Sequence, residues 1–320
     1  MPGRGSGTTK GPTYVLIAGA GHSGSTLLSL ILGSHSRIVS VGEVFVLGEY
    51  VRENRLCTCS RSVADCPFWR GVLAEVSASA GFDASARLGR TSLDIFAPFK
   101  GKGLVARAEL RGLLQVLKMG DPTLLRLSRL VSGRSRTSSA LVGDTFRVLD
   151  AACRVSGKSH VVDSSKAPVR MKRLYLERPG QTKVIYLVRD GRGFIESAMR
   201  RKKVTPEVAS ASWVRINEEA MAMLESMPLS QKITVKYREI CQDAAGTLAA
   251  ICGFLGLTYE PKMLDFKGAE HHDIRGNVMR FSPMGGIKFN EEWRHRLSER
   301  DLSTFREIAG PTARKLGYEL

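Results

Sequence analysis

Residues 13–26 read TYVLIAGAGHSGST, and this stretch determines which fold the rest of the chain is compatible with. Its first half is a short, unbroken apolar run, which is typical of a strand buried on both faces of a parallel sheet. Glycines end the run, and the segment TLLSLIL at 26–32 is dense enough in apolar side chains for a helix that packs on such a sheet. We therefore expect a strand, a glycine-rich turn and a helix in direct succession.

The same succession of strand and helix recurs later in the chain. Further apolar, β-rich runs lie at 37–41, 160–165, 182–190 and 232–237, and the last three each precede a segment with a helical pattern. Alternating strands and helices favour a central parallel sheet flanked by helices, with ligands held at the carboxyl ends of the strands. The fold class that we predict is accordingly α/β.

Residues 54–155 interrupt this alternation. They contain a cysteine-bearing loop, a stretch rich in glycine, serine and arginine, and helical patterns such as ARAELRGLLQVLK. We interpret them as a mostly helical insertion within a single domain that comprises residues 13–320. Residues 1–12, MPGRGSGTTKGP, have no apolar period and are predicted to form a disordered tail.

The composition is that of a folded globular protein in a reducing compartment. Of the 320 residues 43% are hydrophobic and 25% charged, which excludes the disordered and collagen-like classes. No segment approaches the ~20 unbroken apolar residues of a membrane span. The run at 14–20 is at the lower length limit for a secretory signal, and six cysteines are too few for a secreted disulfide scaffold. We therefore predict a cytoplasmic protein without a transmembrane segment.

The net charge of +17 is large and favours polyanionic partners. Nucleic acid, anionic lipid and phosphorylated cofactors are all compatible with it.

The turn GAGHSGST at 19–26 has the two glycines and the setting, between strand and helix, of the phosphate loop G-x-x-x-x-G-K-[ST]. It lacks the lysine that reaches the outer phosphates of a nucleoside triphosphate, because serine stands in that place. The backbone of Ser23, Gly24, Ser25 and Thr26 can still bind a phosphate, since the first N–H groups of a helix are unpaired and its N-terminus is positive. The loop is predicted to bind one phosphate with an appended group; a merely connecting turn is the alternative.

A second anion site is predicted from YLVRDGRGFIESAMRRK at 186–202. Arg189 ends a strand, and Ser197 and Arg201 lie one turn apart on one face of the following helix. Together they could bind a second phosphate. The alternative is a solvated helix face with ion pairs to Asp190 and Glu196.

These two motifs resemble those of sulfotransferases that use 3′-phosphoadenosine-5′-phosphosulfate (PAPS). GHSGSTLL is similar to the 5′-phosphosulfate loop of the family, and VRDGRGFIESAMRRK to its 3′-phosphate motif, in bacterial-type enzymes and protein-tyrosine sulfotransferases above all. The resemblance covers residues 13–50 and 158–320 and implies a P-loop-like sulfotransferase fold whose insertion recognises the acceptor. It implies transfer of a sulfuryl group from PAPS, as co-substrate, to a hydroxyl group of a carbohydrate, lipid, small phenol or peptide.

The resemblance also implies roles for single residues. Nucleotide binding falls to Arg189, Ser197, Arg201 and Tyr237, and a further 3′-phosphate contact to Arg280 in HHDIRGNVMRF, which is similar to a loop over the nucleotide. Glu43 in SVGEV would be the catalytic base, and Lys166 in VVDSSKAP would stabilise the sulfate oxygens. Without the resemblance, these two would be an N-terminal helix carboxylate and a surface lysine.

His22 departs from the family pattern, in which lysine or arginine precedes S-G-[ST]. A histidine is charged only near or below pH ~6.5 unless its neighbours raise its pKa. Either an imidazolium forms beside the phosphosulfate, or Lys166 and the loop amides suffice and His22 assists proton transfer.

No metal is predicted from the sequence. Cys57, Cys59 and Cys66 supply three thiols, whereas a structural zinc site needs four ligands. His271 and His272 are adjacent on one extended segment and therefore point to opposite sides. A disulfide, or packing against the neighbouring aromatic residues, is the interpretation that we prefer for the cysteine loop.

Two rival functions are compatible with parts of the sequence. A phosphate-loop kinase would need the missing lysine and a magnesium ligand, for which Asp163 is the one fair candidate. A non-enzymatic binder of nucleic acid would explain the positive charge, but the aromatic residues are few and are not interleaved with the basic ones. The predicted partner is therefore a small-molecule, glycan or lipid acceptor and not nucleic acid.

Overall fold

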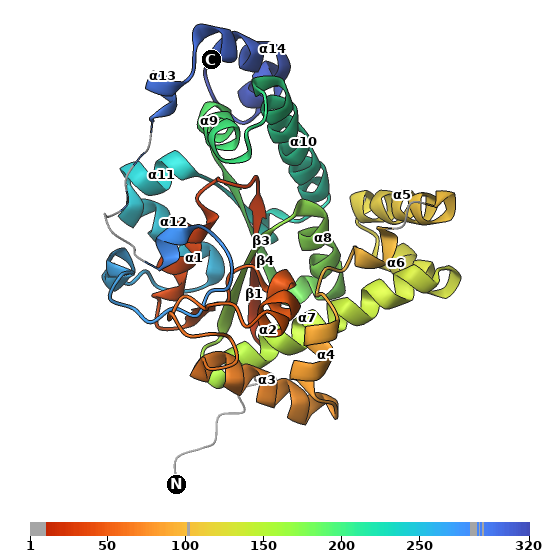
Figure 1. Ribbon diagram of the computed structural model, residues 1–320. Helices are drawn as coiled ribbons and strands as arrows, with labels where there is room; N and C mark the ends of the chain where they lie inside the picture. The colour runs from red at the N-terminus through yellow and green to blue at the C-terminus, as the bar shows by residue number, and fades with distance from the viewer. Residues whose placement is uncertain (1–10, 101–102, 282–286, 288, 290) are drawn as a thin grey trace.

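A parallel sheet of five strands lies at the centre of the computed structural model, which describes residues 11–100, 103–281, 287, 289 and 291–320 (Figure 1). The strand order is β2-β3-β1-β4-β5. The strands are β1 (Thr13–Gly19), β2 (Ile38–Ser40), β3 (His160–Lys166), β4 (Thr182–Val188) and β5 (Lys232–Lys236). Each corresponds to a run predicted from the sequence, so the predicted α/β class is confirmed.

Strand β1 is buried on both faces, because its side chains alternate between two apolar cores. Tyr14, Leu16 and Ala18 belong to one core, and Val15 and Ile17 to the other. Full burial of a large apolar side chain stabilises a fold by about 1.5–3 kcal/mol. The side chains of β1 therefore stabilise the packing of helices on both faces of the sheet.

Helices cover the two faces unequally (Figure 1). On the face of Val15 and Ile17 lie α1 (Ser25–Gly33), α11 (Tyr237–Gln242) and α12 (Ala244–Leu255). On the other face lie α8 (Pro168–Glu177), α9 (Gly191–Lys202), α10 (Pro206–Glu225) and α14 (Glu299–Lys315), with the short α13 (Trp293–Arg296) beside α9.

The segment between β2 and β3 is mostly helical. After α2 (Leu47–Arg52) it contains α3 (Pro67–Ala80), α4 (Ala84–Arg90), α5 (Leu104–Met119), α6 (Pro122–Val131) and α7 (Gly133–Ser156). Short-range signals set the helix ends: Asp121 accepts hydrogen bonds from the first amides of α6, and Gly120 and Gly157 end α5 and α7 in the left-handed conformation.

Helix α10 is not among the helices predicted above. Thr205 caps it and Pro206 occupies its first turn, a favourable pair of start signals. Its buried face packs on α8, α9 and α14. The described residues also form six short 3₁₀ helices: η1 (Val44–Val46), η2 (Ala97–Phe99), η3 (Pro179–Gln181), η4 (Leu229–Gln231), η5 (Pro261–Asp265) and η6 (Val278–Arg280).

Some predicted features fall outside the described residues. The predicted tail does so except for Gly11 and Pro12, and so does part of the glycine-rich segment that follows Arg280. In the part of the chain that the structure describes, no helix is long and apolar enough to cross a membrane.

Candidate active site

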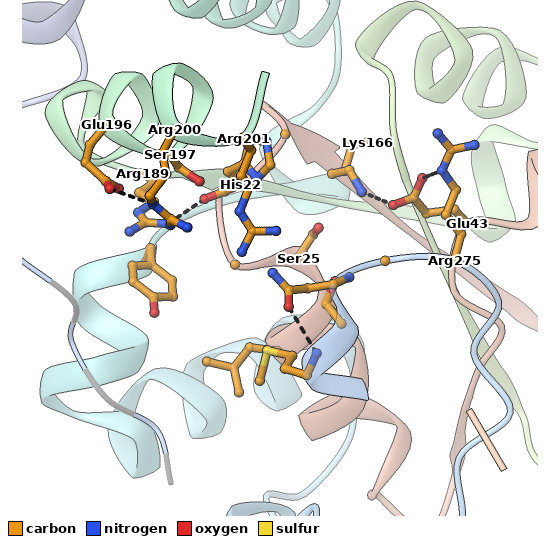
Figure 2. A pocket seen from close by; sticks show the side chains of 18 residues that line it. His22, Ser25, Glu43, Lys166, Arg189, Glu196, Ser197, Arg200, Arg201 and Arg275 are labelled. Atoms are coloured by element: carbon orange, nitrogen blue, oxygen red, sulfur yellow. Dashed lines mark hydrogen bonds and ion pairs between the residues drawn. The ribbon is translucent and has the colours of Figure 1, made fainter. Parts of the chain in front are cut away.

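A cavity of about 560 Å³ lies over the carboxyl ends of β1, β3 and β4 (Figure 2). This volume is within the range of pockets for small molecules and cofactors. Most of the candidate residues from the sequence line it, namely His22, Gly24, Ser25, Thr26, Glu43, Lys166, Arg189, Ser197, Arg201 and Tyr237. The two predicted anion sites therefore face the same space.

The glycine-rich turn joins β1 to α1 through unusual backbone conformations. Gly24 has a φ of 93°, and a Cβ atom there would lie only 2.3 Å from a carbon of the Tyr237 ring. Glycine is required at this position on both grounds. No described side chain caps the first turn of α1, so its N–H groups are available to an anion in the cavity.

Ser23 differs from its neighbours in the turn. Its side chain is buried, with an exposed fraction of 1%, and does not line the cavity. Its hydroxyl has no hydrogen-bond partner among the described residues. Any contribution of Ser23 to anion binding would therefore come from its backbone.

Arg189 connects the turn to the nucleotide motif. Because β1 and β4 are neighbours, the residue after β4 lies beside the turn after β1. The Arg189 guanidinium donates a hydrogen bond of 2.7 Å to the His22 carbonyl and lies 4.9 Å from the centre of the Tyr237 ring. Sequence positions far apart are thus held together by one side chain.

Among the described residues, Arg189 and Arg201 do not form the ion pairs with Asp190 and Glu196 that the solvated-face alternative assumed, although Arg201 is exposed. Asp190 caps α9 and pairs with Arg192, at 2.7 Å. Glu196 pairs with Arg200 at 2.9 Å and with Arg296 at 3.0 Å. Neither carboxylate neutralises the cations that were predicted to bind phosphate.

Glu43 lies between two cations at the other side of the cavity in Figure 2. The Lys166 ammonium donates to one carboxylate oxygen, and the Arg275 guanidinium lies 3.3 Å from the other. Glu43 is buried, with an exposed fraction of 7%. A carboxylate in this setting is held in one orientation and borders the cavity.

The backbone around Lys166 directs its side chain toward Glu43. Lys166 has a φ of 66°, a left-handed conformation that is uncommon outside glycine, and the pairing of β1 with β3 is irregular just before it. Such strained residues cluster at functional sites.

His22 is neutral near pH 7 in this structure. Burial lowers its pKa to about 4, and the positive charges of Arg201, Lys202, Arg189 and Lys166 act in the same direction. These surroundings therefore favour the neutral imidazole.

The segment after His272 borders the cavity at residues that the sequence did not single out. Arg275, Gly276, Asn277 and Met279 line it, and the Asn277 amide donates a 3.0 Å hydrogen bond to the Thr26 hydroxyl. The sequence contains one indication that this segment lies at the site, namely its similarity to the family's loop over the nucleotide.

Arg280, the candidate chosen from that segment, does not line the cavity. Its guanidinium is buried and donates to the Asp273 carbonyl at 2.8 Å, the Leu56 carbonyl at 3.2 Å and the Tyr50 hydroxyl at 3.3 Å. Arg280 thus joins three segments of the protein and faces away from the predicted ligand.

The chain matches a known protein family over part of its length. The sequence profile described as "Sulfotransferase family" matches residues 131–261, which include Lys166, Arg189, Ser197 and Tyr237. Over this stretch, which is less than half of the chain, the sequence is similar to the sulfotransferase family. No curated protein matches the chain.

Solved sulfotransferase structures share the fold. The sulfotransferase domain from the curacin biosynthetic pathway has 17% sequence identity and a TM-score of 0.51, covering 98% of this chain and 100% of that chain. The sulfotransferase domain from the Synechococcus PCC 7002 olefin synthase has 16% identity and a TM-score of 0.50, covering 100% of both chains. At these identities the likeness shows the sulfotransferase fold, whereas the likeness to protein-tyrosine sulfotransferases stays a prediction.

Proposed function

We propose that this sulfotransferase transfers the sulfuryl group of PAPS to a hydroxyl group of an acceptor. The observation that carries the proposal is that the turn at 19–26 and the motif around Arg189 and Ser197 line one cavity. A nucleotide with phosphates at both ends of its ribose matches two anion sites in one pocket.

The residues divide the nucleotide between them. The backbone amides at 23–26 would hold the 5′-phosphosulfate, as the N-terminus of a helix favours an anion. Arg189, Ser197 and Arg201 would bind the 3′-phosphate through charge-assisted hydrogen bonds, and Tyr237 would contact the nucleoside. We do not include Arg280 in this site, because its guanidinium is taken up by carbonyls and a hydroxyl elsewhere.

The chemistry requires a base and a cation. Glu43 would accept the proton of the acceptor hydroxyl as its oxygen bonds to sulfur and the bond from sulfur to the 5′-phosphate oxygen breaks. Lys166 and the loop amides would neutralise the charge on the transferred group and on the leaving adenosine 3′,5′-bisphosphate. His22 would assist proton transfer. The acceptor class stays open among carbohydrate, lipid, small phenol and peptide.

The kinase alternative has less support. Asp163, its candidate magnesium ligand, is buried, lies 3.2 Å from the Arg170 guanidinium and accepts a 2.9 Å hydrogen bond from the Ser165 amide. Its carboxylate is therefore already partnered. Ser25 also stands where a kinase loop has lysine.

Calorimetry tests the donor. Adenosine 3′,5′-bisphosphate should bind more tightly than ATP with Mg²⁺, and the reverse order would overturn the proposal. Adenosine 5′-phosphate is the matched ligand, since it lacks only the 3′-phosphate. Ser197→Ala should weaken the bisphosphate by about tenfold or more, the effect of a lost hydrogen bond to a charged group, and leave adenosine 5′-phosphate unchanged.

Transfer itself is measured with ³⁵S-labelled PAPS. The purified chain is incubated with an extract of cells, and the labelled product is identified by mass spectrometry. A labelled product that Glu43→Gln no longer forms supports the proposal, and its chemical class identifies the acceptor. Equal labelling by both proteins contradicts the assigned base.

A further inference from the structure

Three cysteines and a histidine meet outside the cavity described above. Cys57, Cys59 and Cys66 lie in the loop between α2 and α3, and His272 precedes the segment that borders the active site. Their sulfur atoms and a histidine ring nitrogen all lie within 4.8 Å of one another. The fold therefore supplies the fourth ligand that the cysteine loop lacks in the sequence.

The separations among Cys57, Cys66 and His272 fit the ligands of a tetrahedral ion. The Cys66 sulfur lies 3.9 Å from the Cys57 sulfur and 3.4 Å from His272 Nδ1, and the Cys57 sulfur lies 3.9 Å from the same nitrogen. Zinc bonds of about 2.3 Å to sulfur and about 2.0 Å to nitrogen place tetrahedral ligands ~3.5–3.8 Å apart. A disulfide would instead need two sulfurs at about 2.05 Å.

The histidine is held so that Nδ1 faces the thiols. Its other nitrogen, Nε2, lies 3.4 Å from the Glu270 carboxylate, which is the outer partner that metal-bound histidines commonly have. The ring stacks on Phe68 with its centre at 4.7 Å and an interplanar angle of 6°, and Trp69 donates a 2.9 Å hydrogen bond to the His272 carbonyl. His271 points elsewhere and bonds to the Phe266 carbonyl at 2.6 Å.

We propose that Cys57, Cys59, Cys66 and His272 form a structural zinc site. Four protein ligands leave no open position for substrate, as in structural rather than catalytic zinc sites. Thiolates and imidazole select zinc over magnesium and calcium, which prefer oxygen. The site replaces the disulfide or the aromatic packing that we preferred from the sequence, where the three thiols alone were one ligand short.

The site would attach the cysteine loop to the edge of the active site. Next to His272, the Asp273 carbonyl accepts a 3.1 Å hydrogen bond from the Thr58 amide. The Ile274 carbonyl then accepts a 2.9 Å bond from the Glu43 amide, and Arg275 reaches the Glu43 carboxylate. Zinc would therefore fix the position of the segment that borders the cavity at Glu43.

Metal content is the direct test and does not depend on turnover. The full chain, without an affinity tag and purified anaerobically without chelator, should contain about one zinc ion per chain when it is analysed by inductively coupled plasma mass spectrometry. Replacement by Co²⁺ should produce the intense visible and near-ultraviolet bands of a tetrahedral thiolate complex. Glu270→Ala, which removes only the outer partner, should weaken zinc affinity by about 10- to 100-fold.

Matched variants locate the site. Cys59→Ser and His272→Asn should lose the bound zinc, whereas Cys153→Ser and His295→Asn, whose side chains lie outside the cluster, should keep it. A reduced chain that takes up no zinc, a cobalt complex without thiolate bands, or zinc retained by both ligand variants would each overturn the proposal. So would a disulfide between Cys57 and Cys66 in the anaerobic protein. The cobalt spectrum of the unaltered chain decides the question even if the variants fail to fold.

Discussion

At the scale of single residues, Glu43 combines burial with two cationic neighbours. Lys166 and Arg275 hold its carboxylate at the cavity wall. The carboxylate is therefore already in position before a substrate hydroxyl binds. If Glu43 is the base, as we propose, this arrangement holds it in place for proton transfer, and small displacements would lower the rate. A substrate hydroxyl that reaches Glu43 would have to displace the Lys166 ammonium from the carboxylate or share the carboxylate with it.

Glu43→Gln should reduce kcat by about 10²- to 10⁴-fold, the usual contribution of a general base, because an amide cannot accept the proton. Affinity for adenosine 3′,5′-bisphosphate should change by less than about threefold, since the proposed phosphate contacts are made by the turn at 23–26 and by Arg189, Ser197 and Arg201, not by Glu43. Steady-state rates and calorimetry separate the two effects. Glu49→Gln, on α2 beside Arg55, is the matched control and should keep both values. A fully active Glu43→Gln would refute the assignment.

His22 should make the free protein less stable as the pH falls. Its pKa is about 4 in the folded chain and about 6.5 when unfolded, so between these values the unfolded chain binds more protons. Stability is therefore lost as the pH falls from about 6.5 toward 4. Thermal unfolding from pH 7.5 to 5 should show a shallower decline for His22→Asn than for the unaltered chain.

Bound adenosine 3′,5′-bisphosphate provides the internal comparison for His22. Its phosphates would stabilise the imidazolium and raise the pKa of His22, so the pH dependence should flatten in its presence. An identical slope for the variant and the unaltered chain would show that His22 does not titrate as described.

At the scale of elements, the turn between β1 and α1 needs glycine at some positions and not at others. Gly24 adopts a φ of 93° against the Tyr237 ring, whereas Gly21 has open space where a Cβ would stand and no left-handed φ. Two glycines in one loop therefore have different reasons to be there. Gly24→Ala should cost about 1–3 kcal/mol of unfolding free energy, and Gly21→Ala close to nothing.

Urea denaturation of the two glycine variants checks this difference. Equal losses of stability would mean that the turn is not held in the conformation seen against Tyr237. Affinity for the bisphosphate should fall only where the turn is distorted, in Gly24→Ala.

Elements were predictable where the signal is local. The strands follow from short apolar runs bounded by glycine or polar residues, and Arg189 and Lys166 follow from their places at strand ends. Helix α10 was missed although Thr205 and Pro206 mark its start, because its buried positions are largely filled by alanine, serine and methionine. Such residues give a weak apolar period.

Contacts between distant segments were not predictable from one sequence. Arg275 borders the cavity because Ile274 forms hydrogen bonds with Val41 and Glu43, a pairing that leaves no pattern in the chain. The same segment brings His272 to the cysteine loop and turns Arg280 inward. Similarity to the family's nucleotide loop predicted that this segment lies near the cavity, but it did not predict which of its side chains point into the cavity.

At the scale of the whole molecule, the net charge of +17 should act on the rate of nucleotide binding. The cavity is lined by Lys166, Arg189, Arg200, Arg201 and Arg275 against Glu43 and Glu196, so its charge has the sign of the whole protein. A bisphosphate is then attracted over a distance set by salt, about 10 Å at 0.1 M. If the bisphosphate binds as proposed, attraction of this ligand would be one role of the surplus charge that does not involve nucleic acid.

The association rate constant of adenosine 3′,5′-bisphosphate should fall by about tenfold or more between 10 mM and 300 mM KCl, because screening removes long-range attraction. Stopped-flow fluorescence measures it, and uncharged adenosine is the matched ligand whose association should barely respond. The dissociation rate should change less, since short contacts to Arg189 and the loop amides are screened little. If a duplex DNA of random sequence binds more tightly than the bisphosphate at 150 mM salt, the charge serves a polyanion instead. In that case the cavity is not the principal binding site of the chain.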